Sequence, residues 1–249
     1  MSRGSLLRLF LYTGVRKRRF LALLGAFAAL SALIAYLDYR SFRLGYDAGP
    51  YESLFTITFN LTVVASIIFA GDLVSEDFGS YVKYVLLQLG DRASIVFSKF
   101  VVALLMASLV GYVIPVAAQL AVISYFKEVP DLSYVGVLYL YVVAYTSLNA
   151  LVSALLYEKG GKGTMTANIV IWLVAYYIYT NLVMSVSALK KAYYTSLPIL
   201  AEGLYRYYTS VSYGFSLVKP SLTYSVAAPV VVTAFSLAVT YLAARRIRV

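Results

Sequence analysis

The chain contains no cysteine and no histidine, and only 13% of its 249 residues are charged. The missing cysteines exclude disulfides and thiol chemistry. Without histidine as well, haem ligation, most zinc sites and the usual general base of hydrolases are excluded. Hydrophobic residues make up 61% of the chain, and its mean hydropathy is +0.80. Because so few charges cannot cover a water-facing surface, the composition predicts a polytopic membrane protein.

Six charge-free apolar runs are long enough to cross a hydrocarbon core, which takes about 20 helical residues. They cover residues 20–36, 54–70, 100–126, 135–157, 166–188 and 226–244. The third run is long enough to tilt, to kink at Pro115 or to project beyond the bilayer. The first run follows a basic cluster but precedes no convincing cleavage site, so we expect a retained helix. The expected fold is an all-α polytopic membrane protein with one domain over residues 1–249.

The distribution of basic residues predicts the orientation. Six spans put both termini on one side, and a cytoplasmic placement puts 14 of the 21 lysines and arginines inside, as the positive-inside rule requires. The basic residues are scattered at span ends, where they suit contact with anionic lipids. They form no contiguous basic domain, so nucleic-acid binding is not expected. We expect a multi-pass protein of the cell membrane with both termini cytoplasmic.

Residues 75–89, between the second and third runs, are amphipathic. In a helix they place one apolar row on a single side: Phe78, Tyr81, Val82, Val85, Leu86 and Leu89. Ser75 can cap the start, and Gly90 can end the helix. The other side carries Glu76, Asp77, Ser80, Lys83 and Tyr84. The pattern predicts a cytoplasmic helix that lies on the membrane and presents a polar face to water.

Three further segments lie outside the apolar runs. Residues 2–12 combine leucines with Arg3 and Arg8, which favours an N-terminal interfacial helix. Residues 158–163 read EKGGKG, a flexible inner connection. Residues 189–225 hold seven of the 25 tyrosines. We expect them to form an outer helical loop of short helices or a re-entrant hairpin, and an aromatic-lined gate is the alternative.

Charged residues inside the spans are the usual signature of ion-coupled transport. The apolar runs contain no aspartate, glutamate, lysine or arginine. They do contain neutral polar residues: Thr58, Asn60, Thr62, Asn149, Asn168 and Asn181. These side chains line a translocation path or form hydrogen bonds between helices, and both roles stay open. A protein that transports a solute without ionisable residues in its spans draws on an external energy source, or it moves the solute only down its concentration gradient.

No motif for nucleotide binding or hydrolysis is present. A phosphate loop needs a glycine where Leu156 stands and a hydroxyl residue where Gly163 follows Lys162. The serine-nucleophile elbow is also missing, and the histidine-based zinc motif is impossible without histidine. We therefore expect no catalytic activity, no metal site and no cofactor held by this chain itself.

The stretch from residue 76 to residue 99 resembles the loop between the second and third spans in permease subunits of type-2 ATP-binding-cassette (ABC) transporters. That family has a glutamate before a Gly-Thr pair, a leucine-rich stretch, a Pro-x-[Ser/Thr]-Arg element and a lysine seven residues later. The matching elements here are Glu76, Gly79-Ser80, Val85-Leu86-Leu87, Gly90-Asp91-Arg92 and Lys99. The proline is absent, and the stretch from Gly79 to Arg92 is about one residue longer than in the family.

The resemblance implies that residues 75–89 form a coupling helix. Such a helix docks into a separate ATPase subunit, which binds ATP and Mg²⁺, and two permeases and two ATPases make one transporter. The implied contact residues are Glu76, Asp77, Gly79, Ser80, Lys83, Tyr84, Arg92 and Lys99, with Glu158, Lys159 and Lys162 as a secondary contact. An ABC exporter is the first hypothesis. A secondary carrier or channel is the alternative, followed by a membrane-embedded enzyme or an assembly scaffold.

Overall fold

The computed structural model describes residues 8, 10–11, 18–44, 50–75, 92–125, 133–186, 192, 194–201 and 221–246. Within these ranges the chain forms helices joined by turns, and no strand occurs. The expected all-α fold is confirmed at this level.

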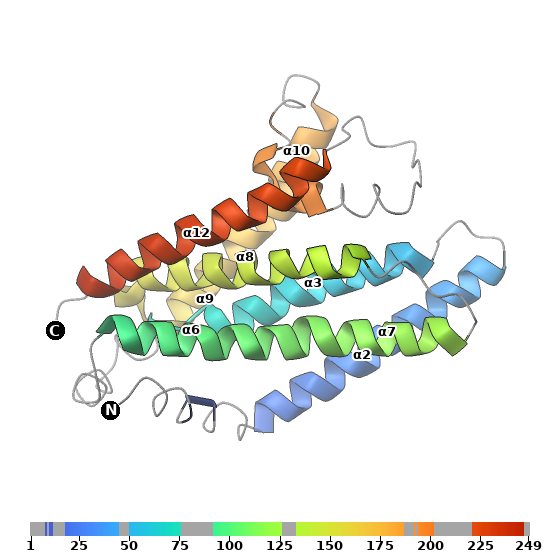
Figure 1. The fold of residues 1–249 in the computed structure, drawn as a ribbon, viewed down its shortest axis with the longest axis horizontal. Helices are drawn as coiled ribbons and strands as arrows, with labels where there is room; N and C mark the ends of the chain where they lie inside the picture. The colour runs from blue at the N-terminus through green and yellow to red at the C-terminus, as the bar shows by residue number, and fades with distance from the viewer. Residues whose placement is uncertain are drawn as a thin grey trace.

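The helices follow one another in alternating directions and form an elongated bundle (Figure 1). They are α2 (Arg18–Arg43), α3 (Pro50–Ala70), α6 (Arg92–Ser108), η1 (Leu109–Val113), α7 (Ile114–Tyr125), α8 (Ser133–Leu155), η2 (Tyr157–Lys159), α9 (Gly160–Leu173), η3 (Val174–Tyr179), α10 (Thr180–Ser185) and α12 (Leu222–Arg246). The π-helical turn η1 joins α6 to α7 without a break, and the π-helical turn η3 joins α9 to α10 in the same way.

Four helices are long and apolar enough to cross a membrane. They cover Phe20–Leu37, Arg92–Val122, Val135–Leu155 and Leu222–Arg246, and a shorter apolar helix covers Ile57–Ala70. The run expected at 166–188 is helical through α9, η3 and α10. These are the features of an integral membrane protein. The six-span layout and the orientation stay predictions.

Several helices extend beyond the apolar runs that predicted them. Helix α6 begins at Arg92 rather than at residue 100, and α12 begins at Leu222 rather than at residue 226. A helix satisfies its own backbone hydrogen bonds, so it can continue past the hydrocarbon into the polar interface. Charged residues such as Arg92 and Lys99 therefore mark the edge of the apolar run and not the end of the helix.

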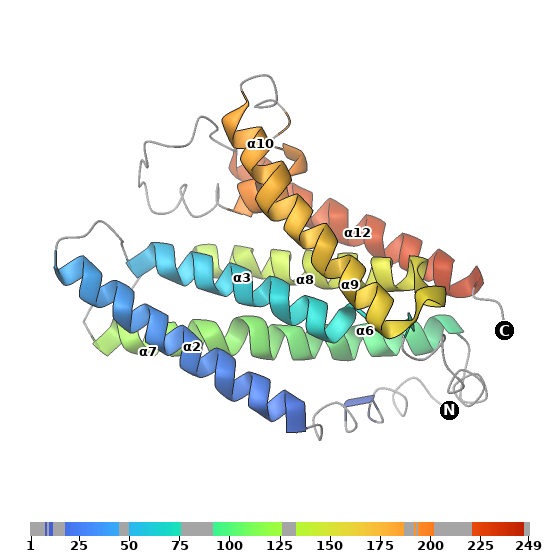
Figure 2. The ribbon, with the colours of Figure 1, turned by 180° about the vertical axis from the view of Figure 1, so that it is seen from behind.

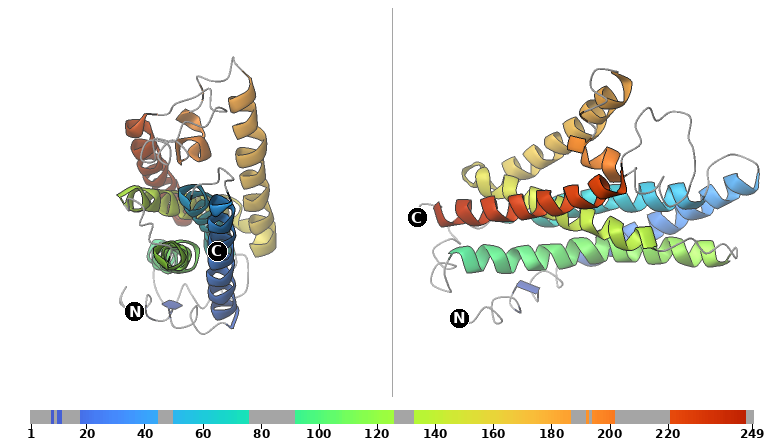
Figure 3. Two further views of the ribbon diagram at one scale, coloured as in Figure 1. Left: turned by 90° about the vertical axis from the view of Figure 1, so that its right-hand side faces the viewer. Right: turned by 45° about the horizontal axis from the view of Figure 1, so that its top comes forward.

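Helices α3 and α8 form the centre of the bundle. Helix α8 packs against α12 and α3, and α3 also contacts α6, η1 and α2. The rings of Phe59 on α3 and Tyr141 on α8 meet edge to face with centroids 6.3 Å apart. An end-on view shows α8 between α12 and the helix formed by α6 and α7, with α3 beside it (Figure 3). Burial of this central pair gives the bundle its core.

The helix formed by α9, η3 and α10 touches the bundle mainly at its beginning. From there it diverges from α3 and α2, as seen from behind (Figure 2). Much of its apolar surface is exposed, including Ile169, Val170, Val174 and Ile178. Such a surface suits contact with lipid or with another apolar surface rather than with water.

Residues 194–201 fold back between this helix and the bundle. Leu200 and Ala201 are fully buried and join the core around Phe59 and Tyr141. The Tyr179 hydroxyl is bonded to the Thr195 hydroxyl, and Thr180 Oγ1 lies 3.2 Å from Ser196 Oγ. Residues 197–201 are helical, so this described part of the predicted 189–225 loop is a short helix packed into the bundle.

The turn η1 carries a glycine where its backbone meets α3. A Cβ atom on Gly111 would lie 2.5 Å from the Ala65 Cβ and 2.9 Å from the Leu61 carbonyl oxygen. Since real Cβ atoms do not approach other atoms so closely, only glycine allows these two backbones to meet as they do.

We therefore expect Gly111→Ala to destabilise the protein by about 1–3 kcal/mol, the usual cost of overpacking. The matched control is Gly136→Ala on α8, since a Cβ atom there meets nothing within 4 Å. Thermal unfolding in detergent, followed by the fluorescence of the single tryptophan Trp172, measures both variants. Equal midpoints for the two would contradict the close approach of η1 to α3.

Candidate functional site: the turn that precedes the amphipathic segment

Helix α3 ends at Ala70, residues 71–74 form a turn, and Ser75 is helical at the start of the predicted amphipathic helix. The Gly71 N–H still donates to the Ile67 carbonyl over 2.9 Å. A Cβ atom on Gly71 would overlap that carbonyl oxygen, so glycine allows the tight exit from the helix. We call residues 71–75 the 71–75 turn.

Side chains from two other helices hold the carbonyl groups of the 71–75 turn. The Asn168 amide on α9 donates to the Gly71 oxygen and to the Thr164 oxygen, each over 3.1 Å. The Lys99 ammonium on α6 donates to the Leu73 oxygen over 3.1 Å. Because Asn168 is only 3% exposed, its two amide hydrogens find these partners instead of water.

A serine on α8 holds the amides of the same turn. Ser153 Oγ accepts hydrogen bonds from the N–H groups of Val74 and Ser75, at 2.9 Å and 3.2 Å. Both serines are buried, so water does not compete for these bonds. One hydroxyl oxygen with two lone pairs thus satisfies two backbone donors.

The hydroxyl groups form a chain from α8 to α9. Ser75 Oγ lies 3.4 Å from Ser153 Oγ and 2.6 Å from Thr164 Oγ1, and Thr164 Oγ1 lies 3.0 Å from the Gly161 carbonyl oxygen. One assignment of the hydrogens uses every group: Ser153 donates to Ser75, Ser75 donates to Thr164, and Thr164 donates to Gly161. The chain therefore connects Ser75 with the 158–163 connection.

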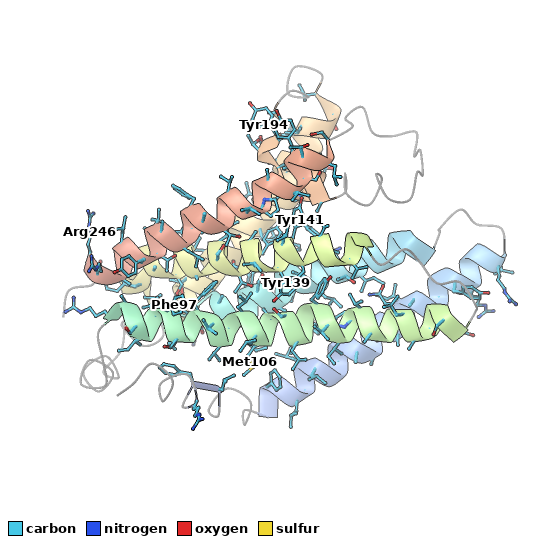
Figure 4. The ribbon with its side chains drawn as sticks, viewed as in Figure 1. Phe97, Met106, Tyr139, Tyr141, Tyr194 and Arg246 are labelled. Atoms are coloured by element: carbon cyan, nitrogen blue, oxygen red, sulfur yellow. The ribbon has the colours of Figure 1, made fainter. Side chains whose placement is uncertain are left out.

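The 71–75 turn lies at a basic end of the bundle. The Lys99 ammonium is 5.8 Å from the centre of the Phe10 ring, and the Arg245 guanidinium is 5.0 Å from the centre of the Tyr241 ring. Both are cation–π distances. Val74 and Ala244 share one apolar cluster, which brings Arg245 and Arg246 to this same end (Figure 4).

The structure places the predicted ATPase contacts in two groups. Arg92 and Lys99 are half-buried on α6, and Lys99 contacts the 71–75 turn. Glu158 and Lys159 are exposed in η2, and Lys162 is exposed near the start of α9. Both groups lie at the end of the bundle that holds Ser75. The remaining predicted contacts lie outside the described residues: Glu76, Asp77, Gly79, Ser80, Lys83 and Tyr84.

Most of the predicted path residues are buried and hydrogen-bonded inside the bundle. Thr58 accepts from Gln119 Nε2 over 3.1 Å, Thr62 donates to the Gly111 oxygen over 3.1 Å, and Asn149 donates to Ser66 Oγ over 3.1 Å. Asn168 holds the 71–75 turn, as described above. These contacts are of the interhelical kind that the sequence left open. Asn60 is half-buried, Asn181 is exposed, and the path itself stays a prediction.

Sequence reasoning missed Gly71, Ser153 and Thr164. A glycine directly after the second apolar run was a usable signal for a helix exit. Ser153 had no such signal, since it is one small polar residue inside a long apolar run. Thr164 also had no signal in the sequence, because its role depends on the crossing of α9 over the end of α3.

Among the described residues, no three histidine, cysteine, aspartate or glutamate side chains gather as a metal site would require. No protein-family model matches the chain, and no curated protein matches it. The function is therefore inferred from the sequence pattern and from the geometry of the 71–75 turn.

We expect Ser153→Ala to loosen the 71–75 turn, because two buried N–H groups lose their acceptor at a cost of about 1–3 kcal/mol. Hydrogen–deuterium exchange of a peptide covering residues 71–75 should become faster. The control is Ser147→Ala on the same helix, because that buried hydroxyl donates only to the Ala144 carbonyl of α8. Equal exchange in both variants would show that Ser153 does not hold the turn.

Proposed function

We propose that the chain is the permease subunit of a type-2 ABC transporter, most simply an exporter. Residues 75–89 are its coupling helix, and a separate ATPase subunit binds to the polar face of that helix. The observation that carries the proposal is the attachment of Ser75, the first residue of this segment, to α8 and α9.

A coupling helix needs a fixed attachment to the spans that it moves. The 71–75 turn is held by Lys99 of α6, Ser153 of α8 and Asn168 of α9. Movement of residues 75–89 would therefore displace three helices and not α3 alone. A helix that merely rests on lipid requires no such buried attachment.

The energy source follows from what the sequence lacks. The six apolar runs have no acidic or basic residue, and the chain has no phosphate loop, so uphill transport would draw its energy from a partner. The ATPase subunit would bind ATP and Mg²⁺. Closure of two ATPases would press on the coupling helices of two permeases and open a path between the permeases.

The 158–163 connection provides a second contact with the ATPase in this proposal. Glu158, Lys159 and Lys162 are exposed, and the hydroxyl chain through Thr164 links their loop to Ser75. The two contacts would therefore move together. With both termini cytoplasmic, this end of the bundle would face the ATPase.

We expect Glu76→Arg and Asp77→Arg to abolish binding of the ATPase and ATP-dependent transport, because each reverses a charge on the proposed contact face. The control is Asp47→Arg, which reverses a charge in the loop expected on the opposite side of the membrane. Affinity purification of the tagged chain from its own membranes, followed by mass spectrometry, should recover a phosphate-loop ATPase with the parent and the control.

Two results would overturn the proposal. One is a complex that contains no phosphate-loop protein while Glu76→Arg and Asp77→Arg leave transport intact. The other is proton-linked transport by the purified chain alone in liposomes, which is the behaviour of a secondary carrier. Turnover of a lipid or peptide by the purified chain would indicate an enzyme instead.

A further inference from the structure

Two helices of the bundle contain an internal proline, Pro115 in α7 and Pro229 in α12, and both are buried. A proline has no N–H, so the carbonyl four residues earlier loses its α-helical donor. In α12 the affected carbonyl belongs to Ser225. Pro115 is the second residue after the π-helical turn η1, where the Ile114 N–H donates to the Leu109 oxygen five residues earlier, so the missing N–H of Pro115 faces the carbonyls of Val110 and Gly111. Inside an apolar bundle, a carbonyl without a donor is unfavourable because no water can replace the lost partner.

In each case a hydroxyl from a neighbouring helix donates to the affected carbonyl. Thr62 on α3 donates to the Gly111 oxygen over 3.1 Å, and Tyr141 on α8 donates to the Ser225 oxygen over 2.7 Å. Thr62, Tyr141 and Ser225 are at most 2% exposed. Water therefore cannot take the place of these hydroxyls.

We propose that Tyr141 and Thr62 act as latches, each replacing the backbone donor that a proline removes. The Tyr141 latch fixes residues 222–228, the part of α12 before Pro229, against α8. Breaking this one hydrogen bond frees α12 to bend at Pro229, because the helix has no backbone donor of its own there.

The position of Tyr141 links the latch to the 71–75 turn. Tyr141 and Ser153 lie on the same helix, twelve residues apart, which is about 18 Å along an α-helix. A shift of α8 caused by the turn would reach α12 through Tyr141. Only this consequence depends on the proposed function. The latch itself is a property of the isolated chain.

Tyr141→Phe tests the latch, since it removes only the hydroxyl and keeps the ring that packs on Phe59. We expect the thermal midpoint to fall by several degrees when residue 229 is proline. In a Pro229→Ala background the fall should be less than half as large, because the new N–H donates to Ser225. If Tyr141 contributed only through its ring, Tyr141→Phe would lower the midpoint equally in both backgrounds.

The control is Tyr139→Phe, on the same helix and facing α6 (Figure 4). Its hydroxyl lies 3.0 Å from Ser108 Oγ and contacts no carbonyl freed by a proline. Tyr139→Phe should therefore lower the thermal midpoint by the same amount in the parent and in the Pro229→Ala background. Equal costs of Tyr141→Phe in both backgrounds would overturn the latch at Pro229.

A distance measurement tests the bend directly. The chain has no native cysteine, so nitroxide labels can be attached at Thr223→Cys on α12 and Gly136→Cys on α8, both exposed positions. Tyr141→Phe should broaden the distribution of distances between the labels, and addition of Pro229→Ala should narrow it again. An unchanged distribution in Tyr141→Phe would show that the hydroxyl does not hold α12.

If Pro229→Ala does not fold, the Thr62 latch provides an independent double-mutant cycle. Thr62→Val should lower the midpoint less in a Pro115→Ala background than in the parent. The control is Thr146→Val, because the Thr146 hydroxyl donates only to the Val142 carbonyl of its own helix. Equal costs of Thr62→Val in both backgrounds would overturn the latch at Pro115.

Discussion

A backbone group inside an apolar helix bundle has no water to bind and needs a partner within the protein. Regular helix supplies that partner except where a helix ends, turns or contains a proline. At these places the chain uses hydroxyls and amides of neighbouring helices. Ser153 binds two amides of the 71–75 turn, Thr62 binds the carbonyl of Gly111, and Tyr141 binds the carbonyl of Ser225. The packing of the helices depends on these bonds.

Helix α8 is central to this arrangement. Near one end Ser153 holds the start of the amphipathic segment, and nearer the other end Tyr141 holds α12. Between them α8 packs against α3 and α12. In the proposed mechanism, a displacement at the basic end of the bundle would reach α12 through these two contacts of α8.

The helical fold was predictable because long apolar runs without charges leave few alternatives. The ends of the helices were less predictable, since α6 begins at Arg92 and includes Lys99, both outside the apolar run. The special role of Pro115 was only partly predictable, because a kink there was one of three expected outcomes and the donor from Thr62 depends on the crossing of α3. The role of Ser153 could not be predicted, since it arises only when α8 passes the end of α3. Local sequence does not encode such contacts between distant segments.

The central claim is that residues 75–89 transmit force from an ATPase to the spans through the attachment of Ser75. The most direct measurement places a single cysteine at position 83, in the cysteine-free chain, and attaches a photo-crosslinker in native membranes. The account predicts one dominant crosslinked protein, a phosphate-loop ATPase, with a yield that changes when ATP is added. Crosslinks to lipid alone, with no ATPase recovered in either nucleotide state, would contradict it.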